Sequence, residues 1–166
     1  METITNDIET DLDKEVLKIV KRASAASKFG LRVKEIRVTN FLSDKMLMIL
    51  VIREGVTYSL FSRIQHFTPF TDDNWADFLD ISLKSLQRYR QTRKTFKSIQ
   101  SEKIIEIAEV SKAGIEVFGD AQKFSNWLET PNFSLGSIKP IDLLKDSYGK
   151  DLVLGELTRI NHGILA

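Results

Sequence analysis

FTDDNWADFLDISLKSLQRYRQTRKTF, residues 70–96, contains two short helical patterns separated by a tight break. Thr71 is a typical N-cap residue for the first helix. The apolar residues that follow have the i, i+3, i+4 spacing of one buried helix face: Trp75, Phe78 and Leu79. After a break at Asp80–Ile81, Ser82 can cap a second helix that runs to about Gln91, with Leu83 and Leu86 expected to be buried. Two short helices joined by such a turn have helix-turn-helix geometry.

Apolar spacing and cap residues predict helices along most of the remaining chain, and therefore an all-α fold. The expected helices cover residues 14–26, 44–54 with Ser43 as N-cap, 57–67, 101–118 with Ser101 as N-cap, a segment capped by Asp120, a short segment beginning at Pro140, and a final segment ending at Gly163. Residues 1–13 are acidic and expected to be loose. Residues 31–38 alternate partly in polarity, which suggests a short strand.

Composition is that of an ordinary globular protein. Among 166 residues, 42% are hydrophobic and 28% are charged. The formal net charge is +1, so the net charge gives no strong electrostatic attraction to nucleic acid or to a membrane surface. The longest apolar run, residues 46–52, is too short to span a bilayer. Cysteine is absent, which excludes disulfides and suits a reducing compartment. We therefore expect a cytoplasmic protein without membrane contact.

Acidic and basic residues lie on opposite sides of the break at Asp80–Ile81. Four aspartates occur between residues 72 and 80, whereas no acid occurs from Ile81 to Ser101. A solvated basic face explains most charge runs of this kind. Here, however, the bases begin in the second helix of the helix-turn-helix, the helix that enters the major groove, and polar residues are mixed among them. The candidate DNA-binding residues are Ser82, Lys84, Ser85, Gln87, Arg88, Arg90, Arg93 and Lys94.

Sequence patterns typical of enzymes are absent. The two histidines, His66 and His162, lack metal-ligand spacing, and the 8 glycines form no phosphate-binding loop. Adjacent carboxylates such as Asp72 and Asp73 are explained by the positive end of a helix dipole. The sequence predicts a binding protein, not an enzyme, with no catalytic residue, metal site or cofactor.

The C-terminal third carries several short motifs in a fixed order. They are VFGD at 117–120, WL at 127–128, PN at 131–132, LG at 135–136, Pro140, LL at 143–144, RI at 159–160, GI at 163–164 and Ala166. This run resembles the toxin-binding domain of the Xre/MbcA/ParS antitoxins. The segment LDISLKSLQRY, residues 79–89, resembles the helix-turn-helix of the same family. One departure is Lys84–Ser85, where the family often has Arg-Thr. A lysine keeps the charge but loses the bidentate fork that reads guanine.

The resemblance implies three parts and three partners. Residues 1–42 would be a variable, partly flexible segment, residues 43–110 an Xre-like helix-turn-helix domain, and residues 111–166 a toxin-binding and dimerisation domain. The partners would be a RES-domain toxin that hydrolyses NAD or uses it for ADP-ribosylation, the operator DNA of the protein's own promoter, and a second copy of the chain. The protein would then be the antitoxin of a type II toxin–antitoxin module that represses its own operon.

Two sets of site residues accompany this hypothesis. The proposed dimerisation residues, which would serve partly as core, are Phe124, Trp127 and Leu128. The proposed toxin-binding residues are Arg159, His162, Gly163, Ile164, Leu165 and Ala166. A glycine cap would hold this tail in a defined place, and a defined tail loses little entropy when it enters a partner's pocket. Alternatively, Ile164 and Leu165 fold back onto the protein's own core.

A second class of function stays open at this point. The protein is then a free-standing helix-turn-helix transcriptional regulator whose C-terminal domain only dimerises. A RES-domain gene beside the coding sequence would favour the antitoxin, and its absence would favour the regulator.

Overall fold

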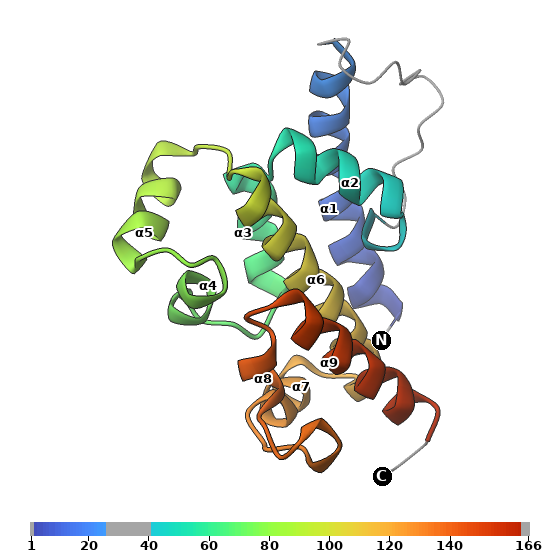
Figure 1. The fold of residues 1–166 in the computed structure, drawn as a ribbon. Helices are drawn as coiled ribbons and strands as arrows, with labels where there is room; N and C mark the ends of the chain where they lie inside the picture. The colour runs from blue at the N-terminus through green and yellow to red at the C-terminus, as the bar shows by residue number, and fades with distance from the viewer. Residues whose placement is uncertain (1, 26–40, 164–166) are drawn as a thin grey trace. The chain divides into compact units, whose positions relative to one another are not determined.

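The computed structural model describes residues 2–25 and 41–163 of the chain, and helices dominate this part (Figure 1). The elements are α1 (Glu2–Ala25), η2 (Phe41–Ser43), α2 (Lys45–Glu54), α3 (Tyr58–Phe67), α4 (Asp72–Phe78), α5 (Leu83–Thr92), α6 (Ser98–Phe118), α7 (Ala121–Leu128), η3 (Phe133–Leu135), α8 (Pro140–Leu143) and α9 (Ser147–Asn161). Extended pairing in the described residues is limited to one isolated bridge between Asn132 and Ile138. The all-α prediction is confirmed, and the strand expected at 31–38 lies outside the described residues.

The expectation that residues 1–13 are loose is wrong, because α1 begins at Glu2. The helix is stabilised by burial of one face, whose apolar residues recur at helical spacing: Leu12, Val16, Ile19, Val20 and Ala23. Tertiary burial of this face therefore supports a helix that begins in a segment whose composition alone indicated a loose end.

Two predicted helix starts are also corrected. The N-cap of α2 is Asp44 rather than Ser43, and its carboxylate accepts from the backbone N–H groups of Met46 and Leu47. α6 begins at Ser98, three residues before the predicted cap Ser101. The Ser101 hydroxyl is buried, accepts from the Val56 N–H at 2.8 Å and donates to the Phe96 carbonyl at 3.3 Å. Ser101 therefore links distant backbone segments instead of capping its own helix.

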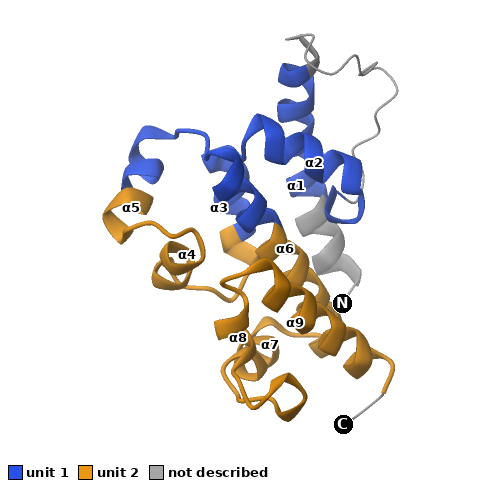
Figure 2. Cartoon of the chain, viewed as in Figure 1, with its two compact units in different colours: residues 1–64, 87–105 blue, residues 65–86, 106–166 orange. Residues whose placement is uncertain are grey.

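The chain divides into two compact units (Figure 2). Unit 1 comprises residues 1–64 and 87–105, and α1 packs there against α2 and η2. Its core includes Phe61, whose ring centroid lies 4.9 Å from that of Phe96. At its edge, Arg63 forms ion pairs with Asp11 and Glu15.

Unit 2 comprises residues 65–86 and 106–166. Its α9 packs against α8 and η3, and α7 packs against α8. The fully buried Trp75 makes edge-on contacts with Phe70 and Phe78. Lys145, which follows α8, forms an ion pair with Asp77 of α4 at 3.1 Å. No helix among the described residues is both long and apolar enough to cross a membrane.

Candidate functional site

The helix-turn-helix has the predicted local geometry. Thr71 caps α4 in a reciprocal capping box with Asn74. At the turn, Asp80 has a φ of 50° and the Ile81 N–H donates to the Ala76 carbonyl at 3.0 Å. The Ser82 hydroxyl then accepts from the Ser85 N–H at 3.1 Å, so the predicted start of α5 is confirmed.

The first turns of α5 present polar side chains to solvent around one buried anchor. Leu86 is buried, whereas Leu83, predicted to be buried, is 39% exposed. The exposed polar residues on this part of α5 and its cap are Ser82, Lys84, Gln87 and Arg88. Lys84 and Arg88 are four residues apart on one helix, so both lie on the same face. Ser85 is half-buried, and its hydroxyl accepts from the Ser82 hydroxyl at 3.0 Å.

Two of the predicted DNA-binding arginines have a partner inside unit 1. The Arg90 Nε donates to the Tyr58 hydroxyl at 3.1 Å. The Arg93 guanidinium lies over the Tyr58 ring, 5.2 Å from its centroid, in a cation–π arrangement. Arg93 itself has a φ of 52°, so the chain turns sharply where α5 ends. These contacts hold the end of α5 to α3, a role that the basic pattern alone did not indicate.

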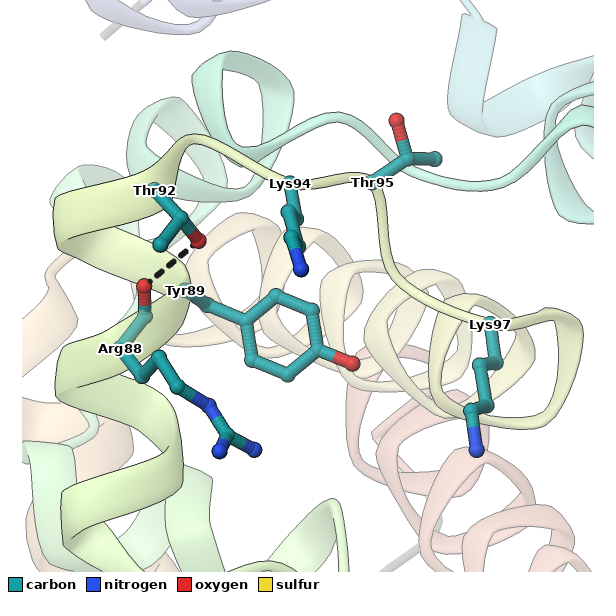
Figure 3. Close-up of a pocket in the computed structure, with 6 residues that line it drawn as sticks. All are labelled: Arg88, Tyr89, Thr92, Lys94, Thr95 and Lys97. Carbon is teal, nitrogen blue, oxygen red and sulfur yellow. Dashed lines mark hydrogen bonds between the residues drawn. The ribbon is translucent and has the colours of Figure 1, made fainter.

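A basic hollow of about 440 Å³ lies at the end of α5 (Figure 3). It is lined by Arg88, Tyr89, Thr92, Lys94, Thr95 and Lys97. The Tyr89 ring stacks on Phe96, with centroids 4.2 Å apart and the ring planes inclined by 12°. Of the three cations, Lys97 was not among the predicted DNA-binding residues. The hollow therefore extends the candidate interface along the loop after α5, from Lys94 to Lys97.

The structure confirms the glycine stop at the end of α9. Gly163 has a φ of 69°, and its N–H donates to the Ile160 carbonyl at 3.0 Å. This is one of the two hydrogen bonds of a Schellman cap. Arg159 and His162 are exposed, and Arg159 also forms an ion pair with the buried Glu156 at 3.4 Å. The other predicted toxin-binding residues, Ile164, Leu165 and Ala166, lie outside the described residues.

The proposed dimerisation residues differ in exposure. Phe124 and Leu128 are buried inside unit 2, at 0% and 1% exposed. Trp127 is half-buried and packs against Phe118, with centroids 5.6 Å apart. Phe124 and Leu128 therefore belong to the core of unit 2, and of the three residues only Trp127 retains solvent-accessible surface.

Two aromatic side chains of unit 2 are strongly exposed, which the sequence pattern did not indicate. Phe133 is 87% exposed and Tyr148 is 88% exposed. Phe133 lies in η3, within a tight loop whose Asn132 caps the turn and pairs with Ile138. Gly136 closes the loop in the left-handed conformation, with a φ of 73°. The turn signature of Asn132 and Gly136 would have predicted the loop, but exposure of the aromatic ring needed the structure.

Electrostatics at the start of α9 favour a protonated lysine. Burial lowers the pKa of Lys150, but a hydrogen bond to Asp151 and the charges of Glu109, Asp151 and Glu106 outweigh it, so that the pKa is raised overall. The Ser147 hydroxyl donates to Glu106 at 2.7 Å and ties α9 to α6 within unit 2. In the described part of the chain, no three acidic or histidine side chains converge as a metal site would require.

Comparison with known proteins identifies both halves of this architecture. The model of the antitoxin Xre-like helix-turn-helix domain matches residues 48–109. The model of the antitoxin Xre/MbcA/ParS C-terminal toxin-binding domain matches residues 113–163. An Antitoxin Xre from Photorhabdus laumondii is 25% identical over 117 residues, which are 70% of this chain and 79% of that protein. An Antitoxin Xre from Yersinia enterocolitica is 32% identical over 87 residues, 52% of this chain and 59% of that protein.

A solved structure shares the fold. One chain of the crystal structure of the M. tuberculosis MbcT–MbcA toxin–antitoxin complex superimposes with a TM-score of 0.54 at 24% identity, covering 64% of this chain and 94% of that one. The two domain models match in the order that the motifs predicted, and together they account for more than half of the chain. The chain belongs to the Xre/MbcA/ParS antitoxin family.

Proposed function

We propose that this antitoxin binds a cognate RES-domain toxin that consumes NAD, and that it neutralises the toxin by blocking its active site with the C-terminal region. The observation that carries the proposal is the position of the toxin-binding domain model, residues 113–163, which ends at the glycine cap of α9. Whether the toxin hydrolyses NAD or transfers ADP-ribose makes no difference to this mode of inhibition, because both reactions require NAD in the pocket.

The end of α9 has the chemistry of a blocking segment. A pocket that accepts NAD holds phosphate and nicotinamide with polar groups, so a segment that fills it must be narrow and must offer polar partners. Exposed Arg159 and His162 supply such partners, and Gly163 directs the chain out of the helix toward the last three residues. A capped helix end has already lost much of its conformational entropy, so that docking costs less.

The exposed aromatic side chains of unit 2 provide a second contact area. Aromatic residues at a protein surface are enriched in interfaces, because they bury a large area at low entropic cost. Phe133 is presented by a tight, hydrogen-bonded loop, and Tyr148 by the first turn of α9. In this proposal Phe133 and Tyr148 hold the toxin while the tail reaches its pocket.

We further propose that the antitoxin represses its own operon. Lys84 and Arg88 on the exposed face of α5 would contact operator DNA, with Ser82, Ser85 and Gln87 beside them. A homodimer, with Trp127 contributing to its interface, would place two recognition helices on a palindromic operator. Sedimentation at micromolar concentration measures the oligomeric state, and a strictly monomeric species would contradict the dimer.

Co-expression with the product of the neighbouring gene tests the antitoxin function directly. Affinity capture of the tagged antitoxin should recover a RES-domain protein, and co-expression should restore growth of cells that the toxin alone arrests. Intracellular NAD should recover in the same cells. If the neighbouring gene encodes no RES-domain protein and no toxicity is relieved, the alternative of a free-standing regulator holds instead.

A further inference from the structure

We propose that the basic hollow at the end of α5 is a binding site for an anion that carries two or more neighbouring phosphate groups. The hollow measures about 440 Å³, within the range of small-molecule sites. Its cations come from one short stretch of chain, the last turns of α5 and the loop before α6: Arg88, Lys94 and Lys97. Three positive charges around one space match the charge of a diphosphate or triphosphate better than that of a single phosphate.

The charge of the hollow is not neutralised within the described residues. In residues 10–23 and 41–163, no carboxylate forms an ion pair with Arg88, Lys94 or Lys97. The sequence contains no acid between Ile81 and Ser101. The neighbouring Arg90 and Arg93 instead contact Tyr58. The six bases of residues 81–101 therefore comprise two arginines with a structural role, three cations that line the hollow, and Lys84 in the first turn of α5.

The backbone that carries these cations is firmly held. The Phe96 N–H donates to the Val56 carbonyl at 2.9 Å, and the Phe96 side chain is buried at 2% exposed. A Cβ placed on Gly55 would meet the Phe96 carbonyl oxygen at 2.6 Å, which shows how closely the two backbones approach. Because the loop is already ordered, little backbone entropy is lost when an anion binds.

The side chains in the hollow suit phosphoryl oxygens. In the view of Figure 3, the Tyr89 ring lies between the side chains of Lys94 and Arg88. The Thr92 hydroxyl donates to the Arg88 carbonyl at 2.8 Å, which braces the turn that carries the guanidinium. Guanidinium and ammonium groups make charge-assisted hydrogen bonds to phosphate, roughly twice as strong as neutral ones.

Two sources can supply this chemistry. One is the pair of adjacent phosphates in a nucleic-acid strand, and in that form the inference rests on the proposed DNA binding. The other is a free nucleoside diphosphate or triphosphate, which would compete with DNA for Arg88. In both cases the hollow lies at the end of α5, whereas Lys84 lies in its first turn. Mutations can therefore separate phosphate binding in the hollow from base recognition by the start of the helix.

Calorimetric titration of the full-length protein with sodium pyrophosphate at low ionic strength tests the site. The double variant Lys94→Gln/Lys97→Gln removes two of the three cations and should weaken pyrophosphate binding at least roughly tenfold. Lys21→Gln/Arg22→Gln, which removes two exposed cations of α1 outside the hollow, is the matched control and should bind as the unmodified protein does. Thermal melts of both variants verify that they fold.

Parallel titrations with ADP and with a non-cognate DNA duplex distinguish the sources. Free nucleotide as the source predicts that ADP binds and displaces the duplex. Nucleic acid as the source predicts that the duplex binds and that ADP does not displace it. In that case the salt dependence of duplex binding should become shallower by about two in its logarithmic slope in the Lys94→Gln/Lys97→Gln variant. The proposal is overturned if the double variant changes neither pyrophosphate binding nor duplex binding. Loss of operator recognition in Lys84 variants bears only on the proposed repressor function.

Discussion

The Phe124 ring of α7 occupies the space that a side chain on Gly114 of α6 would require. A Cβ built on Gly114 would lie 2.2 Å from the Phe124 Cε2. Both residues are buried, and the contact brings α6 and α7 together inside unit 2. Glycine in the interior of α6 therefore serves close packing, not helix termination.

Gly114→Ala should destabilise the protein although alanine favours helix. Alanine gains about 1 kcal/mol of helix propensity over glycine, but overpacking a filled core costs roughly 1–3 kcal/mol. We expect a net loss of up to about 2 kcal/mol in the free energy of unfolding, measured by urea denaturation. Gly155→Ala in α9 is the matched control: no atom lies within 4 Å of its Cβ position, so this variant should be slightly stabilised. Equal effects of the two substitutions would contradict the packing argument.

Charge removal on the exposed face of α5 should abolish operator binding. Lys84→Gln/Arg88→Gln deletes two cations that lie one helical turn apart, and each lost phosphate contact also reduces the salt dependence of binding. Fluorescence anisotropy with the protein's own promoter DNA, at several salt concentrations, measures both effects. Lys21→Gln/Arg22→Gln on α1 removes the same charge from another exposed surface and should bind normally. Operator affinity that is unchanged in the α5 variant would refute the assignment of α5 as recognition helix.

Deletion of residues 163–166 should impair neutralisation and spare the fold. The removed residues follow α9, which ends at Asn161, so the helical core and operator binding should persist. Toxin inhibition should weaken or fail, even where some complex still forms through the rest of unit 2. Growth rescue and NAD measurement in toxin-expressing cells give the readout. Full protection by the truncated chain would show that the tail is only a helix stop, and the blocking contacts would then lie within residues 111–162.

Truncation of the exposed aromatic residue in η3 should reduce toxin capture at little cost in stability. Phe133 is 87% exposed, so Phe133→Ala should change the free energy of unfolding by less than about 0.5 kcal/mol. A central aromatic contact is worth about 2 kcal/mol or more at an interface, so toxin affinity should fall at least roughly tenfold in a surface-binding assay. Ile99→Ala, 71% exposed on α6 and outside the toxin-binding domain, is the control. If both variants capture toxin equally well, Phe133 is not part of the interface.

Acidification should remove the contribution that the buried Glu15 carboxylate of unit 1 makes to the stability of the fold. Burial raises the pKa of Glu15, but hydrogen bonds from Lys18 and Ser59 and the charges of Lys18 and Arg63 lower it below 4.5 overall. A lowered folded-state pKa means that Glu15 stabilises the protein above its unfolded-state pKa and loses this effect as pH falls through the folded-state value.

The Glu15→Gln variant tests this pH dependence. It should be less stable than the unmodified protein at pH 7, by about 1 kcal/mol. The difference should shrink as the pH falls below 4.5, when urea denaturation is compared at both ends of the range. Glu116→Gln is the control, because Glu116 is 53% exposed and its pair with Lys112 at 3.9 Å is long. A stability difference at Glu15 that is independent of pH would exclude the electrostatic explanation.

The sequence alone determined the features that depend on neighbours within one or two helical turns. Thr71, Ser82 and Asp120 cap the helices that they were predicted to cap, and Gly119 and Gly163 adopt the left-handed backbone of helix stops. Capping and apolar periodicity are local effects, because the hydrogen bonds and the buried face form among residues close in sequence. The same local order of motifs was sufficient to identify the antitoxin family.

Only the tertiary structure decided which polar residues are available to a partner. Arg90 and Arg93 belong to the basic stretch by sequence, but Tyr58, 32 residues before Arg90, accepts a hydrogen bond from one and lies under the other. Serine commonly caps helices, yet the Ser101 hydroxyl accepts a hydrogen bond from the Val56 N–H, 45 residues away. Burial and pairing depend on segments that folding brings together from distant parts of the chain, and local periodicity carries no information about them.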